Sequence, residues 1–383
     1  MDTALQSIAE KVYAGQRLSY DDGLTLFATD DLWTVGELAD HVRRRLHGDV
    51  TYYNINRHAN YTNICALSCK FCAFYRKKDD DGAYEYTVDD IVKQAREAAE
   101  AGATEMHIVG GLHPWLPFSY YTDMLRGIRE ATPGLHIKAF TAVEIVHLAR
   151  IDKRAKDIAG VMADLRDAGL GSLPGGGAEV FDDRVHDEAF KGKIRSDKWL
   201  EVHREAHKLG LYSNATILYG HIESIEDRVQ HFCMLRDEED AAIEGNYPAR
   251  FQTVIPLPFI PDDSALQHLP GPGGRDNLRM LAISRLMLDN FAHVKAFWIM
   301  QTLALSQTAL SFGVDDIDGT VVWYDITKVE GKDTHQEVTV NDLRRAIREV
   351  GGQPIERDTL YRKVIRDGAQ WHVEDAPQAL TQR

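Results

Sequence analysis

The 383-residue sequence has few cysteines, no long apolar run and fewer basic than acidic residues. Its four cysteines are Cys65, Cys69, Cys72 and Cys233, and the first three crowd into one short segment. This distribution is a poor disulfide framework and favours metal binding in a reducing compartment, so we expect a cytoplasmic protein. No stretch approaches the ~20 apolar residues that a membrane helix needs. The first twenty residues include acidic side chains and no unbroken apolar segment, which is unlike a signal peptide.

The charge balance narrows the class of partner. Lys and Arg total 44 against 59 Asp and Glu, a formal net charge of −15. An acidic chain repels phosphate backbones and anionic lipid headgroups, so we expect neither nucleic acid nor a membrane surface as a partner. The hydrophobic fraction of 44% is typical of a globular protein that can bury a core.

Short apolar runs alternate with amphipathic stretches after residue 50. The candidate strands are 51–56, 105–111, 136–142, 169–176, 212–220, 251–259 and 294–300, and the clearest helices are 87–102, 120–131, 197–210, 276–291 and 338–352. This order predicts an α/β fold, a full or partial (β/α) TIM-type barrel with helical or mixed extensions at both ends. We predict a barrel at 51–330, an N-terminal extension at 1–50 and a C-terminal extension at 331–383 packed on the barrel.

The segment 63–72 carries the most informative motif, Cys65-x3-Cys69-x2-Cys72. Three thiolates on one short loop can each bind an iron of a [4Fe–4S] cluster and leave the fourth iron without a protein ligand. A structural zinc site is the alternative, with His58 as a fourth ligand, although zinc sites usually carry paired C-x2-C units. Cys233 lies in a helical stretch and is expected to be a small buried hydrophobe.

This motif resembles that of the radical S-adenosylmethionine (SAM) superfamily. Further segments are similar to its menaquinone (futalosine-pathway) and F420 branch, namely 56–75, GGLHP at 110–114, LPGGGAEVF at 173–181, 213–223 and 288–298. The aminofutalosine synthase family is the most similar, because Asn-Arg-His stands at 56–58, Ile-Pro-Leu at 255–257 and GVDDIDGTVV at 313–322. Two segments depart from the relatives. Trp-Tyr-Asp stands at 323–325 in place of paired glutamates, and 236–251 is longer and different.

The resemblance implies a transferase that consumes SAM. A [4Fe–4S] cluster on the three cysteines, reduced by a protein such as flavodoxin or ferredoxin, would generate the 5′-deoxyadenosyl radical. The radical would add to 3-[(1-carboxyvinyl)oxy]benzoate, and aryl migration and decarboxylation would give 6-amino-6-deoxyfutalosine and methionine. The sister dehypoxanthine futalosine cyclase and the F420-branch enzymes are the nearest alternatives. A non-catalytic zinc-binding protein is the alternative of another class.

The cofactor-binding residues that we predict follow the candidate strands, where α/β folds bind ligands. Glycine-rich turns admit close approach of a ligand, and carboxylates can accept hydrogen bonds from a ribose or an amino group. The simpler interpretation is that the glycines form ordinary tight turns and that the carboxylates stabilise helix starts. The resemblance adds the aromatic residue before the third cysteine, and it adds Gly220 and Glu223, because 215–223 is similar to the G-x-I-x-G-x-x-E pattern of the adenine-contacting strand in the superfamily. The full set is Phe71, Gly110, Gly111, Glu144, Glu179, Gly220 and Glu223.

The candidate catalytic residues are those that could meet the two carboxylates of the implied substrate. Buried carboxylates need cationic or hydrogen-bonding partners, and we assign this role to Arg57, His58 and Lys295. His221 and His293 are candidate donors or proton shuttles. For each histidine a structural hydrogen bond is the alternative, and for Lys295 a side chain that reaches out to solvent.

Overall fold

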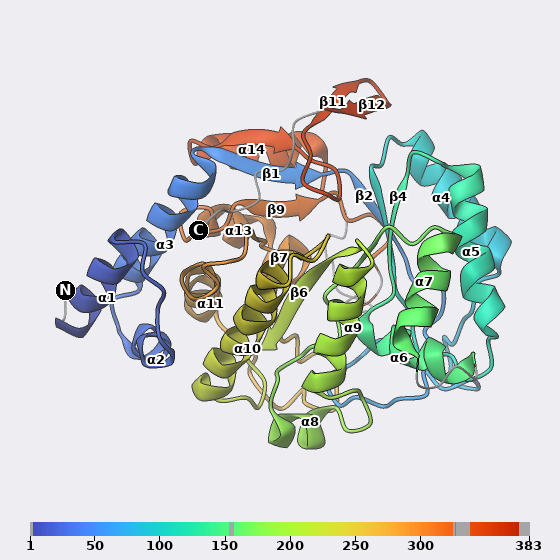
Figure 1. Ribbon diagram of the computed structural model, residues 1–383, viewed down its shortest axis with the longest axis horizontal. Helices are drawn as coiled ribbons and strands as arrows, with labels where there is room; N and C mark the ends of the chain where they lie inside the picture. Colours follow the sequence, from blue (N-terminus) through green and yellow to red (C-terminus); the bar gives the residue numbers. More distant parts are fainter. Residues whose placement is uncertain (1–2, 153–156, 325, 327–337, 375–383) are drawn as a thin grey trace.

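The computed structural model describes residues 3–152, 157–324, 326 and 338–374 (Figure 1). Its central feature is one sheet of seven parallel strands in chain order. The strands are β2 (Asn56–Ala59), β3 (Glu105–Ile108), β4 (His136–Ala139), β5 (Ser172–Leu173), β6 (Tyr212–Tyr219), β7 (Phe251–Pro258) and β8 (His293–Val294). The sheet curls without β8 pairing to β2, so the predicted (β/α) barrel is confirmed in its partial form.

Helices cover the outer face of this sheet. They are α4 (Val88–Glu100), α5 (Phe118–Ala131), α6 (Ala142–Ile151), α7 (Ile158–Ala168), α9 (Ser196–Lys208), α10 (Ile225–Glu244) and α11 (Gly274–Met287). The short helices α8 (Asp183–Ala189), α12 (Trp298–Gln301) and α13 (Leu303–Ala309) belong to the connecting segments. A capping box starts α4, where Thr87 and Asp90 exchange side-chain and backbone hydrogen bonds. Ile91 and Ala95 on this helix are fully buried, as the amphipathic pattern predicts.

A second, smaller sheet lies beside the open edge of the first. Its order is β10 (Gln353–Glu356), β1 (Val50–Asn54), β9 (Asp316–Gly319). Single parallel bridges join Lys295 to Asp316 on one side and Arg57 to Val322 on the other. The segment from β9 to Val322 therefore spans the gap between β8 and β2 and brings its side chains to the interior.

Both ends of the chain add elements to the barrel. The N-terminal helices are α1 (Thr3–Tyr13), α2 (Tyr20–Ala28) and α3 (Leu32–His47); α3 packs on α11, and α2 on α10 and α11. The C-terminal part holds α14 (Val340–Glu349), where the side chain of the N-cap Thr339 accepts from the Asp342 amide. It also holds the hairpin of β11 (Val364–Asp367) and β12 (Gln370–Val373). Positions 331–337 and 375–383 of the predicted extension lie outside the described residues, and the predicted domain division stays a prediction.

The predicted strands 105–111 and 136–142 end three residues early, at Ile108 and Ala139, and three other predicted strands differ more from the structure. The run 51–56 divides at Ile55 between β1 and β2, which belong to different sheets. The run 169–176 forms only two strand residues, because the turn Pro174–Gly177 leaves the sheet. In the run 294–300, Trp298–Gln301 is helical, and the indole of Trp298 donates to the Gly319 carbonyl at 2.8 Å. Among the described residues, no helix is long and apolar enough to cross a membrane.

Candidate active site

A cavity of about 340 Å³ lies at the segments that follow the strands of the main sheet. Cys65, Cys69 and Cys72 all line it, on the loop after β2. Opposite segments of the lining follow β3, β4, β5 and β7, so residues distant in the sequence meet around one space. Of the predicted site residues, the lining brings together the following set: Cys65, Cys69, Cys72, Phe71, Gly110, Gly111, Glu144, Glu179 and Lys295.

The loop that carries the three thiols is held by its backbone. The Cys65 amide donates to the Arg76 carbonyl at 3.0 Å, and the Leu112 amide donates to the Cys65 Sγ at 3.4 Å. The Lys77 ammonium donates to the carbonyls of Cys65 and Leu67, both at 2.9 Å. The loop is thus fixed from three directions while its thiols face the cavity.

The donor set of this loop fits an iron–sulfur cluster. Burial raises the pKa of Cys69 to about 11 and also raises that of Cys72. Thiols in such surroundings stay protonated unless a positive centre such as iron binds the thiolates. His58, the fourth ligand of the alternative zinc site, does not line the cavity with them. The three thiols therefore meet the demand of a cubane with one iron left open to a small molecule.

Gly110 and Gly111 lie where the turn after β3 crosses the cysteine loop. A Cβ on Gly111 would come within 2.4 Å of the Ile64 carbonyl oxygen, and one on Gly110 within 2.8 Å of the Tyr61 ring. The Gly111 amide donates to the Thr62 carbonyl at 2.8 Å. Close backbone packing accounts for both glycines, and it also exposes this turn to the cavity.

Glu144 joins this turn to the next strand end. Its carboxylate accepts from the Gly110 amide at 3.0 Å and from the Tyr61 hydroxyl at 2.8 Å. The same side chain completes a capping box with Thr141 at the start of α6. Burial raises the pKa of Glu144 to about 7, and the donors around it oppose that rise. A carboxyl group with such a pKa loses its proton when a cationic group of a ligand binds beside it, because the cation stabilises the carboxylate.

Glu179 and Phe71 both contact Lys193, a residue that no sequence motif marks. Lys193 forms an ion pair with Glu179, and its Nζ lies 5.1 Å from the centre of the Phe71 ring. Lys193 also lines the cavity. No motif marks it, because it stands in a polar loop, KGK, that reads as solvent-exposed.

Gly220, His221 and Glu223 form a turn outside the cavity lining. The Glu223 carboxylate accepts from the His221 amide at 2.9 Å and pairs with Arg228 at 2.7 Å. The His221 ring donates from Nε2 to the Leu218 carbonyl at 3.1 Å. The structure thus gives these residues local contacts and does not bring them into the lining.

Arg57 and His58 occupy opposite faces of β2. The Arg57 guanidinium lies 5.6 Å from the Trp323 ring centre and donates to the Thr320 hydroxyl at 3.5 Å. His58 is buried against His107 and Tyr324, with ring centroids 4.6 and 5.1 Å away. Burial lowers the pKa of His58 to about 4, so its imidazole is neutral at neutral pH. Tyr324 lines the cavity, whereas Asp325 of the same departing segment lies outside the described residues.

Lys295 belongs to a group of charged residues at one end of the cavity, called the floor below, and no sequence motif marks the other members. The Lys295 ammonium donates to Asp318 at 3.3 Å, and the Lys138 ammonium donates to Glu105 at 2.8 Å. These four residues line the cavity together with His107. The sequence contains a signal for them, since charged residues inside the apolar runs EMHIV and HIKAF would be buried and would therefore need polar partners in the interior.

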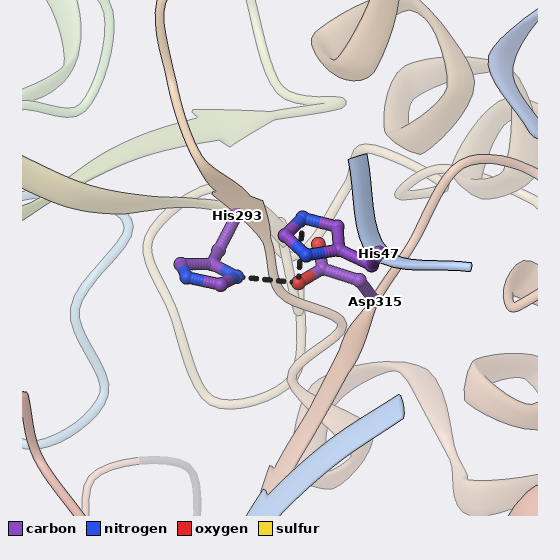
Figure 2. Close-up of side chains that lie close together, drawn as sticks. All are labelled: His47, His293 and Asp315. Carbon is purple, nitrogen blue, oxygen red and sulfur yellow. Dashed lines mark hydrogen bonds and ion pairs between the residues drawn. The ribbon is translucent and has the colours of Figure 1, made fainter. Parts of the chain in front are cut away.

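His293 lies at the beginning of β8, two residues before Lys295, and outside the cavity lining (Figure 2). Its Nδ1 donates to Asp315 at 2.6 Å, and the Nε2 of His47 lies 3.5 Å from the same carboxylate. The other Asp315 oxygen accepts from Arg285. These groups satisfy one another, so the cluster is explained as a buried hydrogen-bond network.

Comparison with known proteins gives concordant matches along the chain. Residues 59–235 match the radical SAM superfamily, and residues 249–367 match the CofH/MqnC C-terminal region. The aminodeoxyfutalosine synthase of Thermus thermophilus is 43% identical over 95% of this chain and 96% of its own length. That of Streptomyces coelicolor is 40% identical over 96% of each chain. The crystal structure of methylornithine synthase (PylB) superposes with a TM-score of 0.71 at 16% identity, covering 91% of this chain and 97% of that one, which shows the shared fold.

Proposed function

Because this chain belongs to the radical SAM superfamily, with a C-terminal region of the CofH/MqnC type, we propose that it is an aminodeoxyfutalosine synthase of menaquinone biosynthesis. The reaction combines SAM, 3-[(1-carboxyvinyl)oxy]benzoate and water to give 6-amino-6-deoxyfutalosine, methionine and bicarbonate. The observation that carries this proposal is the 43% identity to the Thermus synthase over nearly the whole of both chains.

Cys65, Cys69 and Cys72 would hold a [4Fe–4S] cluster, since their thiols share one wall of the cavity. When bound, the cluster supplies the electron that cleaves SAM to the 5′-deoxyadenosyl radical, which adds to the enol-ether double bond of the aryl substrate. The electron would come from a small reducing protein such as flavodoxin or ferredoxin.

The SAM site in this proposal lies between the cysteine loop and the ends of β3 to β5. Glu144 accepts from the SAM amino group, the turn at Gly110 and Gly111 packs against the methionine moiety, and Glu179 and Phe71 contact the nucleoside. The shared lining of the cavity by these residues supports this assignment. Gly220 and Glu223 act from outside the lining by shaping the turn after β6.

The aryl substrate would occupy the remaining part of the cavity. Ile255, Leu257, Phe297 and Met300 give it apolar walls that exclude water, which protects a radical from side reactions. Lys295 offers a cation for a carboxylate. His58 supports the lining from behind His107, and Arg57 and His221 act through the segments on which they lie.

The test is turnover by the anaerobically reconstituted protein with SAM, dithionite and one candidate substrate at a time. We expect the mass of 6-amino-6-deoxyfutalosine with the carboxyvinyloxybenzoate, and methionine in equal amount. A product only from dehypoxanthine futalosine, or only from the substrates of the F420 branch, would assign the chain to those enzymes. A colourless protein that contains zinc and lacks iron and sulfide would reject the whole proposal.

A further inference from the structure

The floor of the cavity holds two ammonium groups that are only partly satisfied. Lys138 and Lys295 are both 3% exposed. A lysine ammonium has three N–H donors. In the described part of the chain, Lys138 donates to Glu105 alone and Lys295 to Asp318 alone. Two donors on each ammonium are therefore left for a group inside the cavity.

Histidine nitrogens beside these lysines also lack partners. His107 lies in register with Lys138 on the neighbouring strand and lines the cavity. Its Nε2 is buried with no hydrogen-bond partner among the described residues, and the same holds for both ring nitrogens of His58. Buried polar atoms are nearly always paired with protein, water or ligand. Together with the spare donors of Lys138 and Lys295, the unpaired His107 nitrogen indicates a polar ligand at this end of the cavity.

Stability alone does not account for this floor. Moving paired charges out of water costs about as much as their attraction returns, and apolar residues of similar volume often serve a fold equally well. The walls above the floor are apolar, at Leu257 and Phe297 among others, and the cysteine loop lines the cavity as well. The floor residues Glu105 and Lys138 lie within strands, whereas the cysteines follow one. The cavity thus runs from an end of two ion pairs, whose ammonium groups keep spare N–H donors, through an apolar section toward the thiols.

We propose that Lys138, Lys295 and His107 bind the ring carboxylate of the aryl substrate, with Glu105 and Asp318 as positioning residues for the two ammonium groups. This inference rests on the proposed function. The ring carboxylate is kept in the product, so it suits a closed, charged end. The enol-ether carboxylate leaves as bicarbonate and must lie nearer the reacting carbon. Anchoring the ring at the floor directs the enol ether toward the cysteine loop.

Ligand binding tests this assignment without turnover. Calorimetry on the reconstituted protein with SAM would compare 3-methoxybenzoate with neutral 3-methoxybenzamide. We expect the benzoate to bind at least about 10-fold more tightly to the wild type. Lys138→Met should weaken benzoate binding by about 10- to 100-fold and leave the amide unchanged. Lys198→Met, at an exposed ion pair on α9, is the matched control and should bind like the wild type.

Lys138→Met leaves Glu105 unpaired and could unfold the protein, so a second variant is needed. Lys138→Met/Glu105→Gln removes both charges and should retain the fold, as judged by its melting temperature, while it loses the preference for the carboxylate. In turnover, the same variant should raise the KM for the aryl substrate.

The two proposals fail in different ways. Equal affinity of the folded double variant and the wild type for the benzoate would overturn the floor assignment, as would a wild type that does not distinguish acid from amide. Absence of 6-amino-6-deoxyfutalosine from a wild type that still prefers the benzoate would overturn the proposed reaction and leave the floor as a carboxylate site.

Discussion

The Nδ1 of His293 donates to the Oδ2 of Asp315 across 2.6 Å at the buried beginning of β8 (Figure 2). Burial alone would raise the pKa of Asp315, but His47, His293 and Arg285 hold it well below the usual range of a carboxyl group. The second oxygen accepts from the Val294 amide at 2.8 Å and from Arg285. One carboxylate therefore ties α3, α11 and β8 together.

Asp315→Asn should destabilise the protein by about 3–5 kcal/mol, because it leaves the buried guanidinium of Arg285 without its counter-charge. Urea unfolding followed by circular dichroism at pH 7.5 would measure the change. Asp289→Asn removes one partner of the partly exposed pair with Arg17 and is the control, with an expected loss below about 1 kcal/mol. Equal losses in the two variants would contradict the role given to Asp315.

Buried neutral histidines should make the fold sensitive to acid. Burial lowers the pKa of His47, His58 and His136 to about 4, and that of His207 and His231 to about 3. The unfolded chain binds protons at these rings below pH ~6.5, whereas the folded chain resists protonation until about pH 4. Stability is therefore fully present above pH ~6.5 and is lost as the pH falls through that window.

Each such ring contributes up to about 3 kcal/mol to the change in the free energy of unfolding across this pH window. Urea unfolding between pH 7.5 and 4.5 should show a steep decrease in the free energy of unfolding. His136→Gln should flatten the slope, and His41→Gln, at an exposed ring, should leave it unchanged. A wild-type free energy of unfolding that does not vary over this range would refute the prediction.

Each of the three loop cysteines should be required for iron. Cys69→Ala should lower the iron content of the reconstituted protein from about four atoms per chain to below one and remove the absorbance near ~400 nm. Cys233→Ala is the matched control, because Cys233 lies on α10, far along the chain and outside the cavity lining, and it should keep full iron. Loss of iron in both variants would contradict the assignment.

The parallel order of the sheet could be predicted because its signals are local. The capping box at Thr87 and the apolar runs of β3, β6 and β7 each report on a few neighbouring residues. The predicted ranges of the short strands β5 and β8 are too long, because burial and apolar composition do not distinguish a strand from core residues in a turn or a short helix. The bridges of β9 to β8 and of Val322 to β2 depend on contacts between distant segments, which no local pattern reveals.

The site divides in the same way. Cysteine spacing and glycine-rich turns are local signals, and the structure brings the cysteine loop and the turn at Gly110 and Gly111 into one cavity lining. Lys138 and Glu105 become meaningful only when two neighbouring strands place them face to face at 2.8 Å. The sequence offers His293 as a candidate donor or proton shuttle, whereas in the structure it precedes Lys295 by two residues and its Nδ1 donates to Asp315.

His58→Ala should impair product formation while SAM cleavage to 5′-deoxyadenosine survives. Removal of the ring leaves a void behind His107 and Tyr324, and the loosened lining would misplace the aryl substrate. We expect the yield of 6-amino-6-deoxyfutalosine per SAM cleaved to fall by about 10-fold or more, measured by chromatography of both products. An unchanged ratio of the two products would remove His58 from the site.

Gly111→Ala should deplete the cluster although residue 111 has no ligand atom. The new methyl group would meet the Ile64 carbonyl at 2.4 Å, and that carbonyl belongs to the residue before Cys65. Neither backbone can retreat easily, because the Gly111 amide is bonded to Thr62 and the Leu112 amide to the Cys65 Sγ. We expect the iron content to fall by more than half and the unfolding free energy by about 1–3 kcal/mol.

Gly134→Ala is the control, since a Cβ there meets nothing within 4 Å. Full iron and a wild-type spectrum in the Gly111 variant would show that the cysteine loop does not depend on this backbone contact.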